Sequence, residues 1–121
     1  MTLQIAMAAA SRCGRERQLN EDALGANGWA LWSNAGVRYF PPTRDQHFLT
    51  DPAVQPLTFA VADGLGGIPG AQQASLLAVE ATTGLLREAS DLADLLTDIQ
   101  SALHTLQSQN PQVGSMGAVI A

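Results

Sequence analysis

The chain has 121 residues, of which 46% are hydrophobic and 14% charged, as expected for one small soluble domain. A net charge of −5 argues against a nucleic-acid partner, because binding to a phosphate backbone needs clustered basic side chains. Neither a signal peptide nor a membrane-spanning segment is indicated, and the single cysteine, Cys13, favours the reducing cytoplasm.

All six basic residues are arginines, and three of them lie between residues 12 and 17. The lack of lysine excludes a Walker A nucleotide site and Schiff-base chemistry. Arginine is therefore the only permanent cation with which the chain can hold an anion.

The first half of the chain predicts strands separated by turns. Residues 3–11 are mostly apolar and predict a first strand, and residues 11–22 form a polar turn region. Turn signals at Asn27-Gly28 and at 34–36 predict one or two hairpin strands. Residues 39–56 hold four of the six prolines and predict an irregular surface loop.

The second half predicts a strand, two helices and a last strand. Residues 57–63 predict a buried strand that ends on Asp63. Residues 71–88 predict a helix, whose expected buried side consists of Leu76, Leu77, Val79, Ala81, Leu85 and Leu86. Ser90 is the expected N-cap of a second helix, which ends at Asn110-Pro111. Its apolar residues at helical spacing are Leu92, Leu95, Leu96, Ile99, Leu103 and Leu106. Residues 114–121 predict an apolar strand.

Residues with catalytic potential concentrate in segments 14–22 and 62–70. Asp63 at the end of a strand can project beyond the sheet edge, and Gly64 lets the backbone turn so that its carbonyl faces the same point. Such oxygen ligands suit Mg²⁺ or Mn²⁺. Glu21 and Asp22 add two carboxylates close to Arg17, and a pair of divalent cations would neutralise such converging charges. Cations of this kind can also turn a bridging water into a nucleophile.

Each feature alone also has an ordinary structural interpretation. Asp-Gly is a common turn dipeptide, and an arginine near a glutamate is usually a solvated pair. The glycines of 64–70 suit close strand-to-helix packing, and Pro69 argues against a dinucleotide loop. His47 and His104 are expected to be exposed or hydrogen-bonded, and Cys13 to be a small buried or surface thiol.

Taken together, the two segments resemble the PP2C-type (PPM) metal-dependent serine/threonine phosphatases. Bacterial members open with G-x-x-R-x-x-N-E-D and continue to V-A-D-G-x-G-G, a glycine, A-S and an A-x-E helix. The matching positions here are Gly14, Arg17, Asn20, Glu21, Asp22, residues 61–67, Gly70, Ala74, Ser75 and residues 77–81. Residues 114–121 are similar to the family's G-T-T strand, with Ser115 and Met116 as looser matches.

The resemblance implies a role for each matched residue. Asp63 would bridge two metals, Gly64 would bind one through its carbonyl, and Glu21 and Asp22 would hold metal-bound waters. Arg17 would bind the substrate phosphate. The implied reaction is hydrolysis of phosphoserine or phosphothreonine by metal-activated water, without a phosphoenzyme. The implied fold is α+β, a β-sandwich flanked by helices in α-β-β-α layers.

The match covers the first half of such a domain. Family members continue to two further metal-binding aspartates, whereas no acidic residue follows Asp98 here. We therefore expect residues 1–121 to be the N-terminal portion of a single phosphatase domain, incomplete in this chain. Residues absent from it would complete a two-metal centre for Mn²⁺ or Mg²⁺. The role of the 28–58 insertion, as a flap or as core packing, is open, and core packing is favoured.

The expected partner is a phosphorylated protein, on which the enzyme would act in the cytoplasm opposite a serine/threonine kinase. No nucleic acid and no membrane is expected as a partner. The alternative is a catalytically inactive module that binds a phosphoprotein through Arg17, or pairs with another chain through its open sheet.

Overall fold

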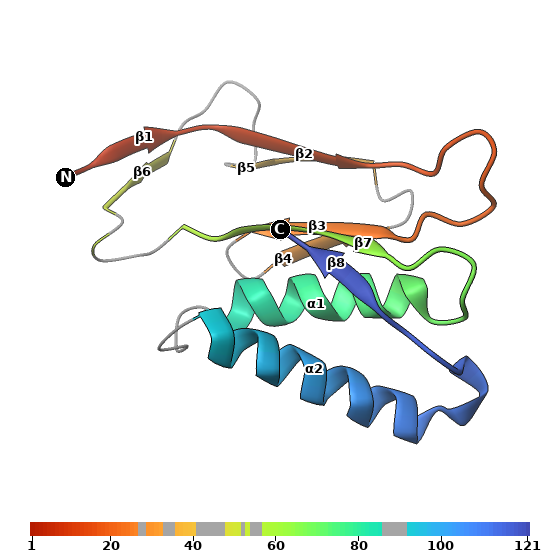
Figure 1. Cartoon of the computed structure of the whole chain (residues 1–121). Helices are drawn as coiled ribbons and strands as arrows, with labels where there is room; N and C mark the ends of the chain where they lie inside the picture. Colours follow the sequence, from red (N-terminus) through yellow and green to blue (C-terminus); the bar gives the residue numbers. More distant parts are fainter. Residues whose placement is uncertain (27–28, 33–35, 41–47, 52, 54–56, 86–91) are drawn as a thin grey trace.

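A four-stranded antiparallel sheet organises the chain (Figure 1). The computed structural model describes residues 1–26, 29–32, 36–40, 48–51, 53, 57–85 and 92–121. The sheet has the order β4-β3-β7-β8. Its strands are β3 (Asp22–Ala26), β4 (Trp29–Trp32), β7 (Phe59–Gly64) and β8 (Ala118–Ile120). The described residues therefore form a small mixed α+β structure.

Two-stranded ribbons and helices lie on opposite sides of this sheet (Figure 1). One ribbon pairs β1 (Leu3–Ile5) with β6 (Phe48–Thr50), and the other pairs β2 (Met7–Ser11) with β5 (Gly36–Phe40). The helices are α1 (Ala71–Leu85), which packs on the sheet, and α2 (Leu92–Gln109), which packs on α1. A short 3₁₀ turn, η1 (Pro111–Val113), connects α2 to β8.

The side chains of strand β7 point alternately to the core and to the opposite face of the sheet, where the acidic residues lie. Ala60, Ala62 and Gly64 are buried, and the core cluster places Ala60 and Ala62 with buried residues of α1. Phe59, Val61 and Asp63 are exposed on the opposite face, because successive side chains of a strand point to opposite sides. The register places Asp22 of β3 directly across from Asp63, so both acidic side chains share the face away from α1.

Small side chains form the contact between α1 and the sheet. The buried residues of the helix are Ala71, Ala74, Ser75, Ala78, Val79, Thr82 and Thr83. The hydroxyls of Thr82 and Thr83 donate to the carbonyls of Ala78 and Val79 at 2.7 and 2.9 Å, so their burial leaves no unpaired donor. This close packing explains why the predicted leucine-rich face is wrong.

Val79 is the one predicted face residue of α1 that is fully buried among those described. Leu76, Leu77 and Ala81 are only half-buried at the margin of the core. The side chain of Leu85 and all of Leu86 lie outside the described residues.

Helix α2 buries a narrow stripe at four-residue spacing. Leu95, Ile99 and Leu103 are buried, as predicted, and Leu106 is half-buried. Leu92 and Leu96 are 64% and 48% exposed, so the expected apolar face is too wide. The proposed N-cap Ser90 lies outside the described residues.

The strands predicted at 3–11, 57–63 and 114–121 are confirmed, although the first is divided at Ala6 and the last is limited to β8. The hairpin of β3 and β4 is also confirmed, and its turn at 27–28 lies outside the described residues. The loop predicted over 39–56 is wrong at β6, which pairs with β1, and at residues 39–40, which belong to β5 and pair with β2. Residues 34–35, 41–47, 52 and 54–56 lie outside the described part of the chain.

The difference in burial between neighbouring leucines of α2 predicts that truncating each to alanine lowers the free energy of unfolding by a different amount. Leu95→Ala should lower the free energy of unfolding by roughly 2–5 kcal/mol, because a fully buried leucine leaves a cavity. Leu96→Ala, at an exposed position, should change it by about 0.5 kcal/mol or less. Guanidinium denaturation followed by circular dichroism measures both, and equal losses would contradict the assigned buried face.

Candidate functional site

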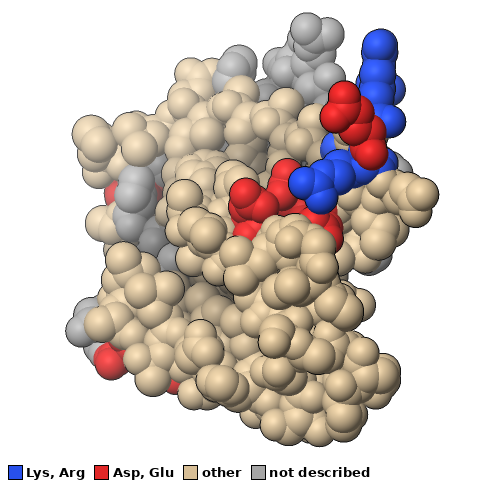
Figure 2. All heavy atoms as spheres, turned by 45° about the vertical axis from the view of Figure 1, so that its right-hand side comes forward, with Lys and Arg blue, Asp and Glu red and all other residues tan. Residues whose placement is uncertain are grey.

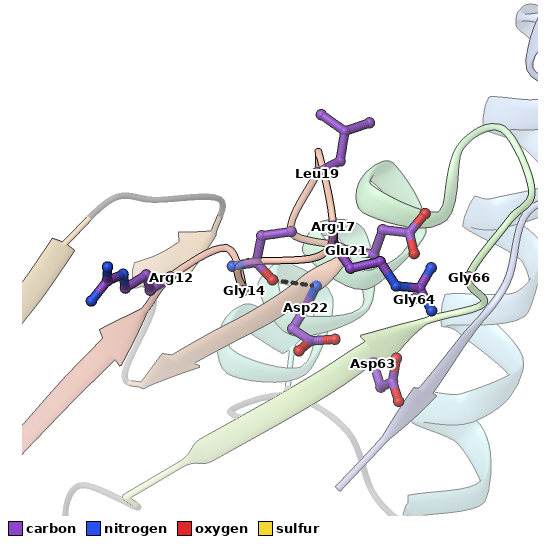
Figure 3. Close-up of a pocket in the computed structure, with 10 residues that line it drawn as sticks. Arg12, Gly14, Arg17, Leu19, Glu21, Asp22, Asp63, Gly64 and Gly66 are labelled. Carbon is purple, nitrogen blue, oxygen red and sulfur yellow. Dashed lines mark hydrogen bonds between the residues drawn. The ribbon is translucent and has the colours of Figure 1, made fainter.

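Segments from two distant parts of the sequence meet at one open pocket of about 400 Å³ (Figure 3). The loop that joins β2 to β3 forms one wall, and the end of β7 with the following turn forms the other. The pocket is lined by all five residues singled out from the sequence, Arg17, Glu21, Asp22, Asp63 and Gly64. The two motif segments therefore share one concave site.

Asp22 and Asp63 form a pair of carboxyl groups at the floor of this pocket. They are cross-strand partners in the antiparallel register of β3 and β7. Although Asp22 is exposed overall, partial desolvation of its carboxyl raises its pKa above the usual 3.8. The negative charges of Asp63 and Glu21 raise this pKa further. Two carboxyls so placed are stabilised by a shared proton or by a cation.

Gly64 allows three backbone segments to approach one another beside the aspartate pair. Its N–H donates to the carbonyl of Glu21 at 3.1 Å. A Cβ at this position would lie 2.7 Å from the Glu21 carbonyl oxygen and would overlap the carbonyl of Ala71. The left-handed backbone of the turn falls on Gly67 and Gly70, with φ of +81° and +87°. Gly64 is thus required for close packing, and the turn itself depends on the later glycines.

Arg17 extends over Gly66, which leaves room for its guanidinium (Figure 3). A Cβ at Gly66 would lie 3.5 Å from Nη1 of Arg17 and 3.1 Å from Oε2 of Glu21. Within the described part of the chain, the sole ion pair joins the amino group of Met1 to Asp51, so it does not engage Arg17. The planar fork of Arg17 is therefore available to a ligand anion.

Charged side chains of both signs gather at one edge of the molecule. Figure 2 shows an acidic patch with basic side chains directly above it. A phosphate ester with a bound cation presents this same combination of charges, because the ester is anionic and the cation needs carboxylates. The patch suits such a ligand better than either ion alone.

Asn20 is a buried member of the site to which the sequence assigned no role. It is 8% exposed, and its Nδ2 donates to Oγ of Ser11 at 2.6 Å. Its Oδ1 accepts from the N–H of Asp22 at 3.1 Å, the dashed line in Figure 3. Nε2 of Gln72 donates to its backbone carbonyl at 3.1 Å. An Asx turn is readable from an asparagine in a loop, but the bonds to Ser11 and Gln72 are tertiary and leave no local signal.

The three acidic side chains do not converge on one point. The carboxylate of Glu21 lies toward Gly66, away from the aspartate pair (Figure 3). Among the described residues, no group of three or more His, Cys, Asp or Glu side chains is placed to hold a metal ion. The aspartate pair fits a hard cation in the kind of its ligands but not in their number.

The remaining candidates lie around or away from the pocket. Cys13 is half-buried, and its Sγ donates to the carbonyl of Arg17 at 3.0 Å. His104 is exposed on α2 and hydrogen-bonds to Gln100 at 2.9 Å, which confirms the expectation for it. His47 lies outside the described residues.

Comparison of the chain with protein-family models, with curated proteins and with solved structures finds no match in any of the three. Among the described residues, neither helix is long and apolar enough to cross a lipid bilayer.

The packing around Gly64 predicts a large effect for one added methyl group. Gly64→Ala should lower the free energy of unfolding by roughly 1–3 kcal/mol, because the new Cβ would meet rigid backbone atoms. Gly14→Ala, in the same pocket, is the matched control, since its Cβ would meet nothing within 4 Å. Thermal unfolding compares the two, and equal stability of both variants would contradict the close approach at Gly64.

The raised pKa of Asp22 predicts how stability depends on pH. The folded state holds this proton more tightly than the unfolded state, so stability is lost as pH rises from 3.8 through the folded pKa. Asp22→Asn should remove this loss and stabilise the metal-free protein at neutral pH. Denaturant midpoints measured across this range check the prediction, and a difference between variant and wild type that does not change with pH would refute it.

Proposed function

We propose that the chain is the N-terminal portion of a metal-dependent serine/threonine protein phosphatase of the PP2C type. The observation that carries the proposal is the meeting of Arg17 with the Asp22–Asp63 pair in one pocket. Arg17 forms no ion pair with another described residue. Such an arginine fork beside two carboxyls can hold a phosphate ester and a hard cation together. The substrate class would be phosphoserine or phosphothreonine in a protein.

The layers of the structure support this proposal without being specific to it. The family's β-sandwich carries helices on its outer faces, and here α1 and α2 cover one face of the main sheet. The ribbons on the other side would belong to the second sheet of such a sandwich. We propose this α-β-β-α arrangement for the complete domain.

Different residues of the chain would bind the phosphate and the cation. Arg17 would bind two phosphate oxygens, and its position over Gly66 would orient the ester toward the aspartates. Asp22 and Asp63 would hold the cation side of the site, with the Gly64 carbonyl as a further ligand and Glu21 holding a metal-bound water. A bound Mn²⁺ or Mg²⁺ would supply a water of lowered pKa. No side chain need form a covalent bond to phosphorus.

The metal centre would need ligands from outside the described residues, because these provide a carboxylate pair and no group of three. Mn²⁺ and Mg²⁺ both match oxygen donors of this kind. The partner would be a protein phosphorylated by a serine/threonine kinase, and the single cysteine of the chain fits a reducing cytoplasm.

A second candidate is a module that binds a phosphoprotein without hydrolysing it. The available guanidinium of Arg17 and the incomplete carboxylate set favour this alternative. The two candidates differ in one measurable respect. With Mn²⁺ present, a binding module would bind the phosphoprotein without releasing phosphate, whereas the phosphatase would release it.

Variants of the two walls of the pocket test the phosphatase proposal in the complete gene product. Arg17→Ala should raise KM for a phosphothreonine peptide about tenfold to a hundredfold, since a charge-assisted hydrogen bond contributes ~1.5–3 kcal/mol. Its Mn²⁺ affinity should stay unchanged. Asp63→Asn should abolish Mn²⁺-dependent phosphate release and preserve the circular dichroism spectrum. Arg15→Ala, outside the pocket lining, is the control.

Unchanged KM and kcat in Arg17→Ala would remove Arg17 from the site. Peptide binding by the wild-type protein without turnover in Mn²⁺ would favour the binding module. Calorimetry with Mn²⁺ separates cation binding from phosphate binding, because it reports on the carboxylates and not on Arg17.

A further inference from the structure

We infer that Asn20 is a positioning residue, which holds Asp22 across from Asp63 and thereby sets the spacing of the carboxylate pair. The consequence for metal binding rests on the proposed function, whereas the effect on the pair itself does not. Nothing in the sequence distinguishes this role from that of a buried loop asparagine.

Asn20 joins three structural elements through polar contacts. Its side-chain oxygen accepts a hydrogen bond from the N–H of Asp22, the first residue of β3. Its side-chain nitrogen donates a hydrogen bond to Ser11, the last residue of β2. Its carbonyl accepts from Gln72 in the first turn of α1. Because the side chain is 8% exposed, little water is available to replace these partners.

The bond to the backbone N–H of Asp22 fixes the direction in which the acidic side chain leaves the strand. The Cβ of a strand residue points to one face of the sheet, and a slip by one residue would move it to the other face. Asp22 begins β3, so no strand residue precedes it to hold its register. The Asn20 carboxamide supplies that constraint from the loop.

Holding Asp22 in this place works against charge repulsion. The register places Asp22 directly across from Asp63, and Glu21 adds a third negative charge to the same pocket. Like charges directly across two strands destabilise a sheet. A loop released from Asn20 would let Asp22 move away from Asp63, which relieves the repulsion and widens the pair.

This inference differs from a purely structural role in a way that a double-mutant comparison detects. A structural asparagine would contribute stability independently of the charge on Asp22. A positioning asparagine would be coupled to that charge, because its bond determines how closely Asp22 approaches Asp63. Thr82 offers a matched control, since it is also 8% exposed and hydrogen-bonded but lies in α1 away from the pocket lining.

The experiment introduces Asp22→Asn into three backgrounds, which are wild type, Asn20→Ala and Thr82→Val. Guanidinium midpoints are measured at neutral pH without metal. The upward shift that Asp22→Asn gives in wild type should be lost in Asn20→Ala and kept in Thr82→Val. An equal shift in all three backgrounds, or no upward shift in wild type, would overturn the inference.

Free Mn²⁺ measured by electron paramagnetic resonance, with the variants introduced into the complete gene product, tests the consequence for the cation. Asn20→Ala should weaken Mn²⁺ binding about tenfold or more, as is typical when a residue behind a metal ligand is removed. Thr82→Val should bind as wild type does, and equal affinities in all three proteins would overturn a role of Asn20 in the cation site. If the complete gene product binds no Mn²⁺, the metal dependence in the proposed function is refuted. The midpoint comparison still decides whether Asn20 positions Asp22.

Discussion

The antiparallel register between β3 and β7 is the constraint on which the site depends. It places Asp22 and Asp63 directly across from each other, so two carboxyls meet at one end of the sheet. Such a pair costs stability unless a proton or a cation neutralises it. The surrounding backbone keeps the pair together, with Gly64 bonded to Glu21 and Asn20 bonded to Asp22. A pair of like charges retained in a folded protein marks this end of the sheet as a candidate functional site.

The same register connects the core to the pocket. Each residue of β7 that faces α1 is small, and the buried residues of α1 are alanine, serine, valine and threonine. This packing brings the first turn of α1 close enough for Ala71 to contact Gly64 and for Gln72 to bond to Asn20. The composition of the core therefore determines how near the helix lies to the site. Larger core residues would move α1 outward and loosen the wall of the pocket.

Much of the fold was predictable because local patterns dominate at several elements. The apolar run before Asp63 and the helical spacing of Leu95, Ile99 and Leu103 were sufficient for β7 and α2. The buried face of α1 could not be predicted in the same way. Leucine is more hydrophobic than alanine and was therefore expected to be buried, but the close packing of α1 on the sheet buries small residues instead. Strand β6 depends on pairing with β1 across more than forty residues, which local composition does not encode.

The five residues named from the motifs line one pocket, and this nearness could be predicted from the two segments. Their mutual geometry and the contacts of Asn20 could not, because these depend on tertiary contacts. Segments 14–22 and 62–70 line one pocket, and the central proposal is that this pocket binds a cation. Mn²⁺ added in trace amounts to the ¹⁵N-labelled chain tests it most directly, because the ion broadens amide signals near its binding site. The account predicts that signals of Asp22, Asp63 and Gly64 broaden first. Broadening centred on Asp94 and Asp98 of α2, with the pocket signals unchanged, would contradict it.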